Sequence, residues 1–223
     1  MRLQYADLSH VVEHGTITYP GLPPPEITDH QSFEDSAARY AAGTEFRINR
    51  IAMVGNTGTY IDSPAHRIRG GADLAELALE MVAGVPGLVV DTAGAPLDAE
   101  QLPASATALS GRAVLVRTGW DRHWGGDHYG AIDHPYVNRA AAKALAAAGV
   151  ALVGIDSVNI DATTTGERPA HTALLRAGIP IVEHLCGLEQ LPSEGFEFFA
   201  VPAKVRGMTS FPVRAFARWP RLA

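Results

Sequence analysis

The stretch Gly55-Asn-Thr-Gly-Thr-Tyr60-Ile-Asp62-Ser-Pro-Ala-His66-Arg67 says more about fold and function than any other part of the chain. If residues 56–62 run as an extended strand, alternating side chains place four of them on one face: Asn56, Gly58, Tyr60 and Asp62. Polar groups around a glycine are not a core pattern, and glycine removes bulk where another group must approach closely. His66 follows in a loop that could fold back over this face. The pattern fits a polar site and equally a half-exposed strand that meets water.

The rest of the chain predicts an α/β fold. Four short apolar runs, residues 85–91, 113–118, 151–156 and 179–183, have the length of strands and the composition of strands buried on both faces. An alanine-rich segment, residues 137–149, predicts a helix that ends at Gly149, and residues 172–177 predict a shorter helix. Strands that alternate with helices indicate a sheet covered by helices, with ligand sites beyond the carboxyl ends of its strands.

Length and composition limit the functional classes. The 223 residues fit one domain, residues 1–223, and 47% hydrophobic with 19% charged residues is typical of a globular protein. The net charge is −6 and the basic residues are scattered, so we expect no nucleic-acid partner. No apolar run approaches the roughly 20 residues that span a bilayer. We therefore expect a cytoplasmic protein without a membrane partner.

A second group of polar residues lies in the later part of the chain. Asp156 and Glu183 each follow an apolar run, where a carboxylate must be solvated or paired. His171 precedes an apolar helical turn, a position where a helix-start or surface histidine is more common than a ligand. Asp161 and the threonines after it fit turn formers and helix caps.

Together the two stretches resemble the cyclase family, which includes bacterial kynurenine formamidase and isatin hydrolase. The signature of that family is His-x-Gly-Thr-His-x-Asp-x-Pro-x-His, and residues 56–66 read Asn-Thr-Gly-Thr-Tyr-Ile-Asp-Ser-Pro-Ala-His. Further matching blocks span nearly the whole chain, at residues 7–10, 19–21, 117–120, 156–157, 201–207 and 210–214. The resemblance implies a swivelling β/β/α fold, in which a mixed sheet carries flanking helices.

The departures from the signature concern the metal. In the metal-dependent members, the first two histidines and the aspartate of the signature bind a divalent cation such as zinc or manganese. Here Asn56 and Tyr60 replace both histidines, and amide or phenol oxygens are poor ligands for these metals. The resemblance leaves a residual three-ligand site of Asp62, His171 and Glu183. We expect this metal site to be weakened or absent in such a divergent member.

Three functions remain open. The first is hydrolysis of an amide, lactone or N-formyl bond of a small molecule at Asp62, His66, His171 and Glu183, with His66 as the proton relay. The second is a metal-independent cyclase or isomerase that uses Tyr60 and His66 as acid and base. The third is a non-catalytic binding protein, which is disfavoured because a decayed site would lose such costly polar groups.

The surroundings of the site carry weaker predictions. Trp120 and Trp124 follow a strand end and, together with Asn56, are candidates to bind substrate, although packing in a surface loop fits the two tryptophans nearly as well. The proline-rich loop at residues 20–25 could cover the site or a neighbouring subunit. The resemblance also implies a homodimer or a homotetramer.

Overall fold

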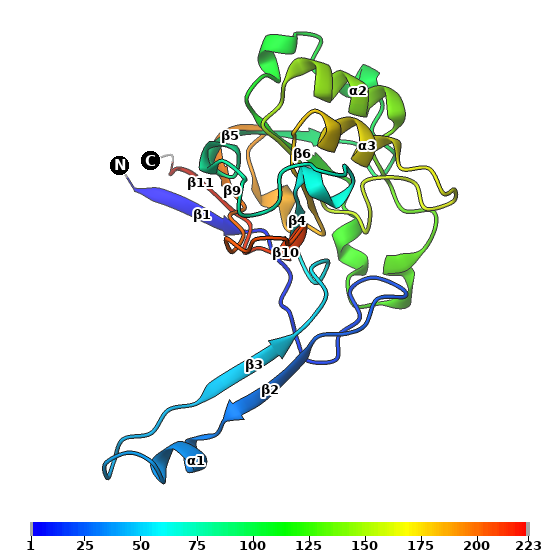
Figure 1. Cartoon of the computed structure of the whole chain (residues 1–223). Coiled ribbons are helices and arrows are strands. Elements are labelled where there is room, and N and C mark those ends of the chain that lie inside the picture. Colours follow the sequence, from blue (N-terminus) through cyan, green and yellow to red (C-terminus); the bar gives the residue numbers. More distant parts are fainter. Residues whose placement is uncertain (1, 222–223) are drawn as a thin grey trace.

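A mixed sheet of nine strands forms the body of the protein in the computed structural model, which describes residues 2–221 (Figure 1). From edge to edge, the order is β1 (Leu3–Asp7), β11 (Phe216–Pro220), β9 (Glu194–Phe199), β5 (Ala83–Asp91), β6 (Ala113–Arg117), β7 (Leu152–Ile155), β8 (Ile181–Glu183), β4 (Tyr60–Asp62) and β10 (Ser210–Pro212). The four central strands, β5 to β8, run parallel, and the outer pairs are antiparallel.

The predicted apolar runs are the parallel strands, and two helices connect them. Helix α2 (Arg139–Ala148) joins β6 to β7, and α3 (Pro169–Arg176) joins β7 to β8. Asn138 caps the start of α2 by accepting from the amide of Ala141 at 2.8 Å, and Gly149 ends the helix at a φ of 67°. Helix α3 begins three residues before the predicted position because Pro169 suits a first helical turn. The predicted α/β fold, a mixed sheet with flanking helices, is confirmed.

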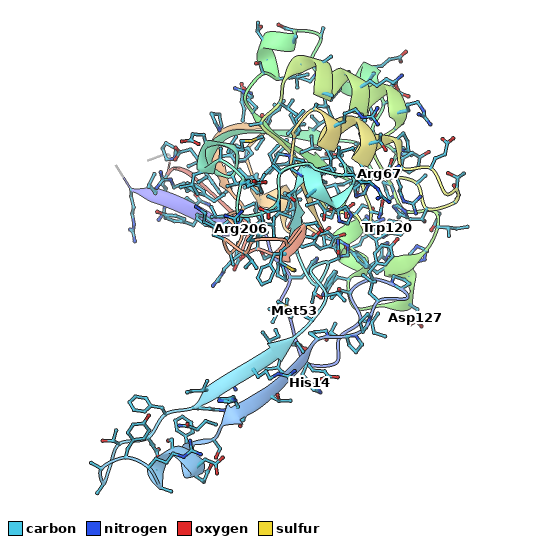
Figure 2. All side chains as sticks on the ribbon, in the orientation of Figure 1. His14, Met53, Arg67, Trp120, Asp127 and Arg206 are labelled. Carbon is cyan, nitrogen blue, oxygen red and sulfur yellow. The ribbon has the colours of Figure 1, made fainter. Side chains whose placement is uncertain are left out.

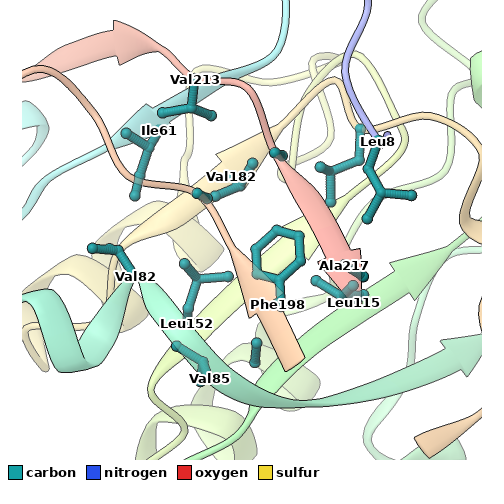
Figure 3. Close-up of a cluster of buried hydrophobic side chains, with 14 of the residues drawn as sticks. Leu8, Ile61, Val82, Val85, Leu115, Leu152, Val182, Phe198, Val213 and Ala217 are labelled. Carbon is teal, nitrogen blue, oxygen red and sulfur yellow. The ribbon is translucent and has the colours of Figure 1, made fainter. Parts of the chain in front are cut away.

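Side-chain alternation divides the core into two clusters. Leu115 of β6 packs on one side of the sheet with Phe198 of β9, as Figure 3 shows, whereas its neighbours Val114 and Val116 pack on the other side with α2 and α3. Both clusters consist of nearly solvent-free side chains, so both faces of the parallel strands are buried, as continuous apolar runs predict.

A two-stranded arm projects from the body (Figure 1). It consists of β2 (Glu26–Gln31) and β3 (Ile48–Ala52), with α1 (Phe33–Ala37) near its tip. The arm exposes large apolar side chains, with 36 to 52% of each accessible: Ile27, Phe33, Tyr40, Phe46, Ile48 and Ile51. Isolated hairpins are at best marginally stable in water, so this surface is suited to being covered.

The helices of residues 2–221 fall short of a membrane span, because none combines the necessary length with sufficient apolar character. The prediction of one domain over residues 1–223 stays a prediction.

Candidate active site

Three antiparallel strands bring the polar residues of the site onto one face of the sheet. Ile61 of β4 and Val182 of β8 belong to the core cluster on the other face, so Tyr60, Asp62 and Glu183 must point to the face that carries α3. Tyr60 lies directly opposite Glu183 in the β4–β8 pair. Asp62 lies opposite Ser210 in the β4–β10 pair.

The strand that carries Tyr60 and Asp62 is shorter than predicted. It spans only Tyr60–Asp62, so the predicted extended run over residues 56–62 is wrong. Gly58 adopts a φ of +64°, and a Cβ atom there would lie 2.7 Å from the side chain of Val12. The glycine thus allows a bend and a close approach, and Asn56 reaches the site from this bend: its Nδ2 donates to Oδ1 of Asp62 at 3.4 Å.

Hydrogen bonds fix which nitrogen of His66 is free. The hydroxyl of Ser210 donates its one proton to Oδ1 of Asp62, so it must accept from Nδ1 of His66, 2.9 Å away. Nδ1 also lies 3.5 Å from Oδ1 of Asp62. The neutral ring therefore carries its proton on Nδ1. Nε2 is then the nitrogen with the lone pair, and the His66 side chain, which is 30% exposed, lines the pocket.

Asp161 holds His171, the second histidine of the site. Its Oδ2 accepts from Nδ1 of His171 at 2.7 Å, and its two oxygens accept the amides of Ala170 and His171 at the start of α3. Nε2 of His171 consequently points at two other carboxylates, 3.7 Å from Oδ2 of Asp62 and 3.9 Å from Oε1 of Glu183. Burial lowers the pKa of His171, but the hydrogen bond to Asp161 and the nearby carboxylates of Asp62 and Glu183 outweigh burial and raise that pKa to about 10.

Glu183 is completely buried and is held by two donors. Oε2 accepts the hydroxyl proton of Tyr60, and Oε1 accepts the amide of Ile160 at 2.5 Å. Burial and the charge of Asp62 raise the pKa of Glu183. Burial and the charge of Glu183 also raise the pKa of Tyr60, so the phenol keeps its proton.

Three residues of the active site, Asp62, His66 and His171, are placed so that they could hold a divalent metal ion. One donor atom from each of Asp62, His66 and His171 lies within 4.8 Å of the others. Oδ2 of Asp62 is buried and has no hydrogen-bond partner in the described chain, so its lone pairs are free. Two imidazoles and a carboxylate suit zinc, manganese or iron(II), and the carboxylate on Nδ1 of His171 is the usual support of a metal-bound histidine. The residues present thus fit a divalent cation.

A pocket of about 270 Å³ opens over this cluster. Its lining includes the site residues Asn56, Tyr60, His66, His171 and Glu183, and further Tyr19, Leu22, Arg67, Asn159 and Arg168. Tyr19 and Leu22 come from the segment that leads into β2, so the root of the arm forms part of the pocket wall.

The structure brings six of the eight predicted site residues together: Asn56, Tyr60, Asp62, His66, His171 and Glu183. The three-residue cation cluster contains His66, whereas the resemblance implies Glu183 as the third ligand. Both oxygens of Glu183 accept hydrogen bonds within the described chain.

The two tryptophans lie outside the pocket lining. Nε1 of Trp120 donates to the carbonyl of Tyr129 at 2.9 Å, and Trp124 stacks on His10 at 3.8 Å and lines a neighbouring cavity. The ring centroid of His184 lies 5.6 Å from that of Trp124, in an edge-on contact, and 5.1 Å from that of Tyr60. A substrate-binding role for the tryptophans stays a prediction.

Several residues that matter to the site give no functional signal in the sequence. Asp161 has the signature of a helix cap, and its second task, holding His171, is not visible in the sequence. Ser210 is 148 positions from Asp62, and only the sheet order brings them together. Arg67 and Arg168 give no signal of their own, although Arg67 directly follows the signature stretch.

Comparison with known proteins identifies the family. The family model described as "Putative cyclase" matches residues 6–162. The kynurenine formamidase of Salinibacter ruber is 31% identical over 213 residues, which cover 95% of this chain and 96% of that protein.

Solved structures share the fold of this chain. Isatin hydrolase A from Labrenzia aggregata superposes with a TM-score of 0.82 at 23% identity, covering 98% of this chain and 94% of the other. A protein described as a potential metal-dependent hydrolase with cyclase activity gives a TM-score of 0.79 at 23% identity, and the match covers 99% of this chain and 100% of the other. The chain therefore belongs to the cyclase family and is a hydrolase.

Proposed function

We propose that this protein hydrolyses an amide bond of a small molecule, either an N-formyl arylamine or a lactam, with lactones as the next class. The observation that carries the proposal is the state of His66, whose Nδ1 is held by Ser210 and whose side chain lines a pocket of suitable size. The names of the relatives, kynurenine formamidase and isatin hydrolase, support the same bond type.

His66 is the proton relay in this proposal. Nε2 accepts a proton from a water molecule, and the water oxygen forms a bond to the carbonyl carbon of the substrate. The carbon–nitrogen bond then breaks, and His66 returns the proton to the leaving nitrogen. Ser210 and Asp62 stabilise the imidazolium that forms in between, because Nδ1 keeps its proton and lies 3.5 Å from a buried carboxylate.

Other residues of the pocket position the substrate. Asn56 lines the pocket and donates to Asp62, and in this proposal its amide group also polarises the substrate carbonyl. Tyr60 gives its proton to Glu183 and presents only oxygen lone pairs to the pocket, so as an acid it would first have to release that bond.

A divalent metal would be held by Oδ2 of Asp62, Nε2 of His171 and, as a third donor, His66. Bound there, it would lower the pKa of a water molecule and polarise a carbonyl. The proposed relay uses Nε2 of His66 to carry the proton, so His66 cannot serve as a metal ligand at the same time. Only Asp62 and His171 then remain as ligands, and we propose that zinc or manganese binds weakly. Without a metal, a protonated His171 balances part of the buried charge of Asp62, Asp161 and Glu183.

Two other functions remain. A metal-independent cyclase or isomerase would use Tyr60 and His66 as acid and base, and the pairing of the Tyr60 proton with Glu183 makes this less favourable. A non-catalytic binding protein would have no need for the buried carboxylates around His171, which are costly to keep.

One experiment separates these functions. The purified protein is assayed on a formanilide, a lactam such as isatin and an aryl lactone, with and without a chelator, and its metal content is measured by mass spectrometry. We expect hydrolysis of at least the formanilide or the lactam, with less than one metal per chain after chelation. Stoichiometric metal that survives chelation would refute the weak site, and rearrangement without hydrolysis would favour the isomerase.

A further inference from the structure

A second cavity of about 400 Å³ continues from the active-site pocket, since both share Arg67 and Arg168 in their linings. Three further basic side chains line it: Arg139 of α2, Lys143 of α2 and Arg176 of α3. This basic groove is unusual for a chain of net charge −6 with scattered lysines and arginines.

The positive charge of the basic groove is mostly unbalanced. Its one acidic lining residue is Glu167, which accepts from Arg139 at 2.5 Å. The other four basic residues have no carboxylate partner in residues 2–221: Arg67, Lys143, Arg168 and Arg176. Four cations around one hollow repel one another, and an anion of multiple charge would relieve this.

Side chains, and not the start of α3, would hold such an anion. The amides of Ala170 and His171 are occupied by Asp161, and that of Thr172 donates to the carbonyl of Arg168. Nη1 of Arg168 is fixed by backbone carbonyls, which include those of Thr165 and Glu167 at 2.7 Å each. This anchors one guanidinium between the two cavities, with its remaining N–H groups available for a bidentate contact.

We propose that the substrate carries a phosphate or diphosphate group, which binds in the basic groove while the scissile bond lies at His66. A single carboxylate would neutralise only one of the four unbalanced charges, whereas a phosphate ester or a diphosphate neutralises two or three. This inference rests on the proposed hydrolytic function for the position of the scissile bond. The anion site itself is independent of that function.

Calorimetry with inorganic pyrophosphate tests the anion site directly. The unmodified protein should bind pyrophosphate at low ionic strength, more weakly as salt rises, and should bind acetate much less. The double variant Lys143→Ala/Arg176→Ala should weaken binding about tenfold, because it removes two charged contacts outside the catalytic pocket. The charge-matched control is Lys204→Ala/Arg206→Ala, which removes one lysine and one arginine from an exposed loop; Figure 2 shows Arg206 well apart from Arg67.

Several results would overturn the proposal. It fails if pyrophosphate does not bind, if acetate binds equally well, or if the control weakens binding as much as the groove variant. The link to catalysis is tested with a formanilide and its ring-phosphorylated analogue. The ratio of their kcat/KM values should favour the phosphorylated compound and fall about tenfold in the groove variant but not in the control. An unchanged ratio refutes the link to the substrate, and absence of turnover with intact pyrophosphate binding refutes only the hydrolytic function.

Discussion

The change Tyr60→Phe removes the donor that holds the fully buried Glu183. Tyr60 itself is 2% exposed, and its hydroxyl proton goes to Oε2 of Glu183. The described chain offers no second donor to Oε2, because the amide of Ile160 serves the other oxygen. A hydrogen bond to a charged group contributes about 1.5 to 3 kcal/mol to stability.

For a protein of this size, each kcal/mol corresponds to roughly 2 to 4 °C in Tm. We therefore predict that Tyr60→Phe lowers Tm by about 3 to 12 °C, measured by calorimetry. The matched control is Tyr129→Phe, which makes the same chemical change at a side chain that is 5% exposed. The hydroxyl of Tyr129 has no partner in the described chain, so its removal should leave stability unchanged or slightly increased.

Equal Tm values for the two variants would refute this reasoning. The catalytic role predicted for Tyr60 requires a separate result, a loss of about a hundredfold or more in rate, which is typical of a lost general acid or oxyanion donor. If Tyr60→Phe loses stability and keeps its rate, Tyr60 is a structural support of Glu183 and the catalytic assignment is withdrawn.

Three other perturbations test separate parts of the structure. Ser210→Ala should lower kcat about tenfold or more, because it removes the hydroxyl that holds the ring of His66. The control Ser63→Ala, which removes a hydroxyl that donates to the carbonyl of Thr209, should leave kcat unchanged. Equal kcat values for the two variants would contradict this prediction. Burial, and next the charge of His10, lower the pKa of His184 to about 3, so its stabilising effect is present above pH 6.5 and lost as pH falls toward 3. Asparagine tolerates the φ of 58° at position 184. Between pH 7 and pH 5, the free energy of unfolding measured in urea should therefore fall by about 2 kcal/mol less in His184→Asn than in the parent protein. An equal fall in both proteins would contradict this prediction. Phe46→Asp on the arm should shift the predicted homodimer or homotetramer toward monomers in light scattering, and an unchanged mass would exclude the arm as the interface.

The sequence predicted those elements whose signal is local. The four apolar runs and the alanine-rich helix each contain their own periodicity and end signals, and each is present in the structure close to its predicted bounds. The strand at Tyr60–Asp62 is shorter than predicted because Gly58 takes a left-handed conformation, which alternation alone does not reveal.

The candidate site was predictable as a set of residues and not as a set of contacts. The signature and its departures single out Tyr60, Asp62 and His66, but periodicity gives only the face on which a side chain lies. The neighbours of these residues depend on the sheet order β8–β4–β10, in which no two adjacent strands are consecutive in the chain. The position of Ser210 beside Asp62 could therefore not be read from the sequence.

The most direct test of the proposed hydrolysis is the initial rate of Asp62→Asn on the substrate that the parent protein cleaves. This variant removes the buried charge that Ser210 and His66 face, and with it the support of the proposed relay. We predict that kcat/KM falls about a hundredfold or more, while Asp91→Asn, which neutralises an exposed carboxylate paired with Arg117, stays close to the parent. A correctly folded Asp62→Asn variant that hydrolyses the substrate as fast as Asp91→Asn would contradict the assignment of this cluster as the active site.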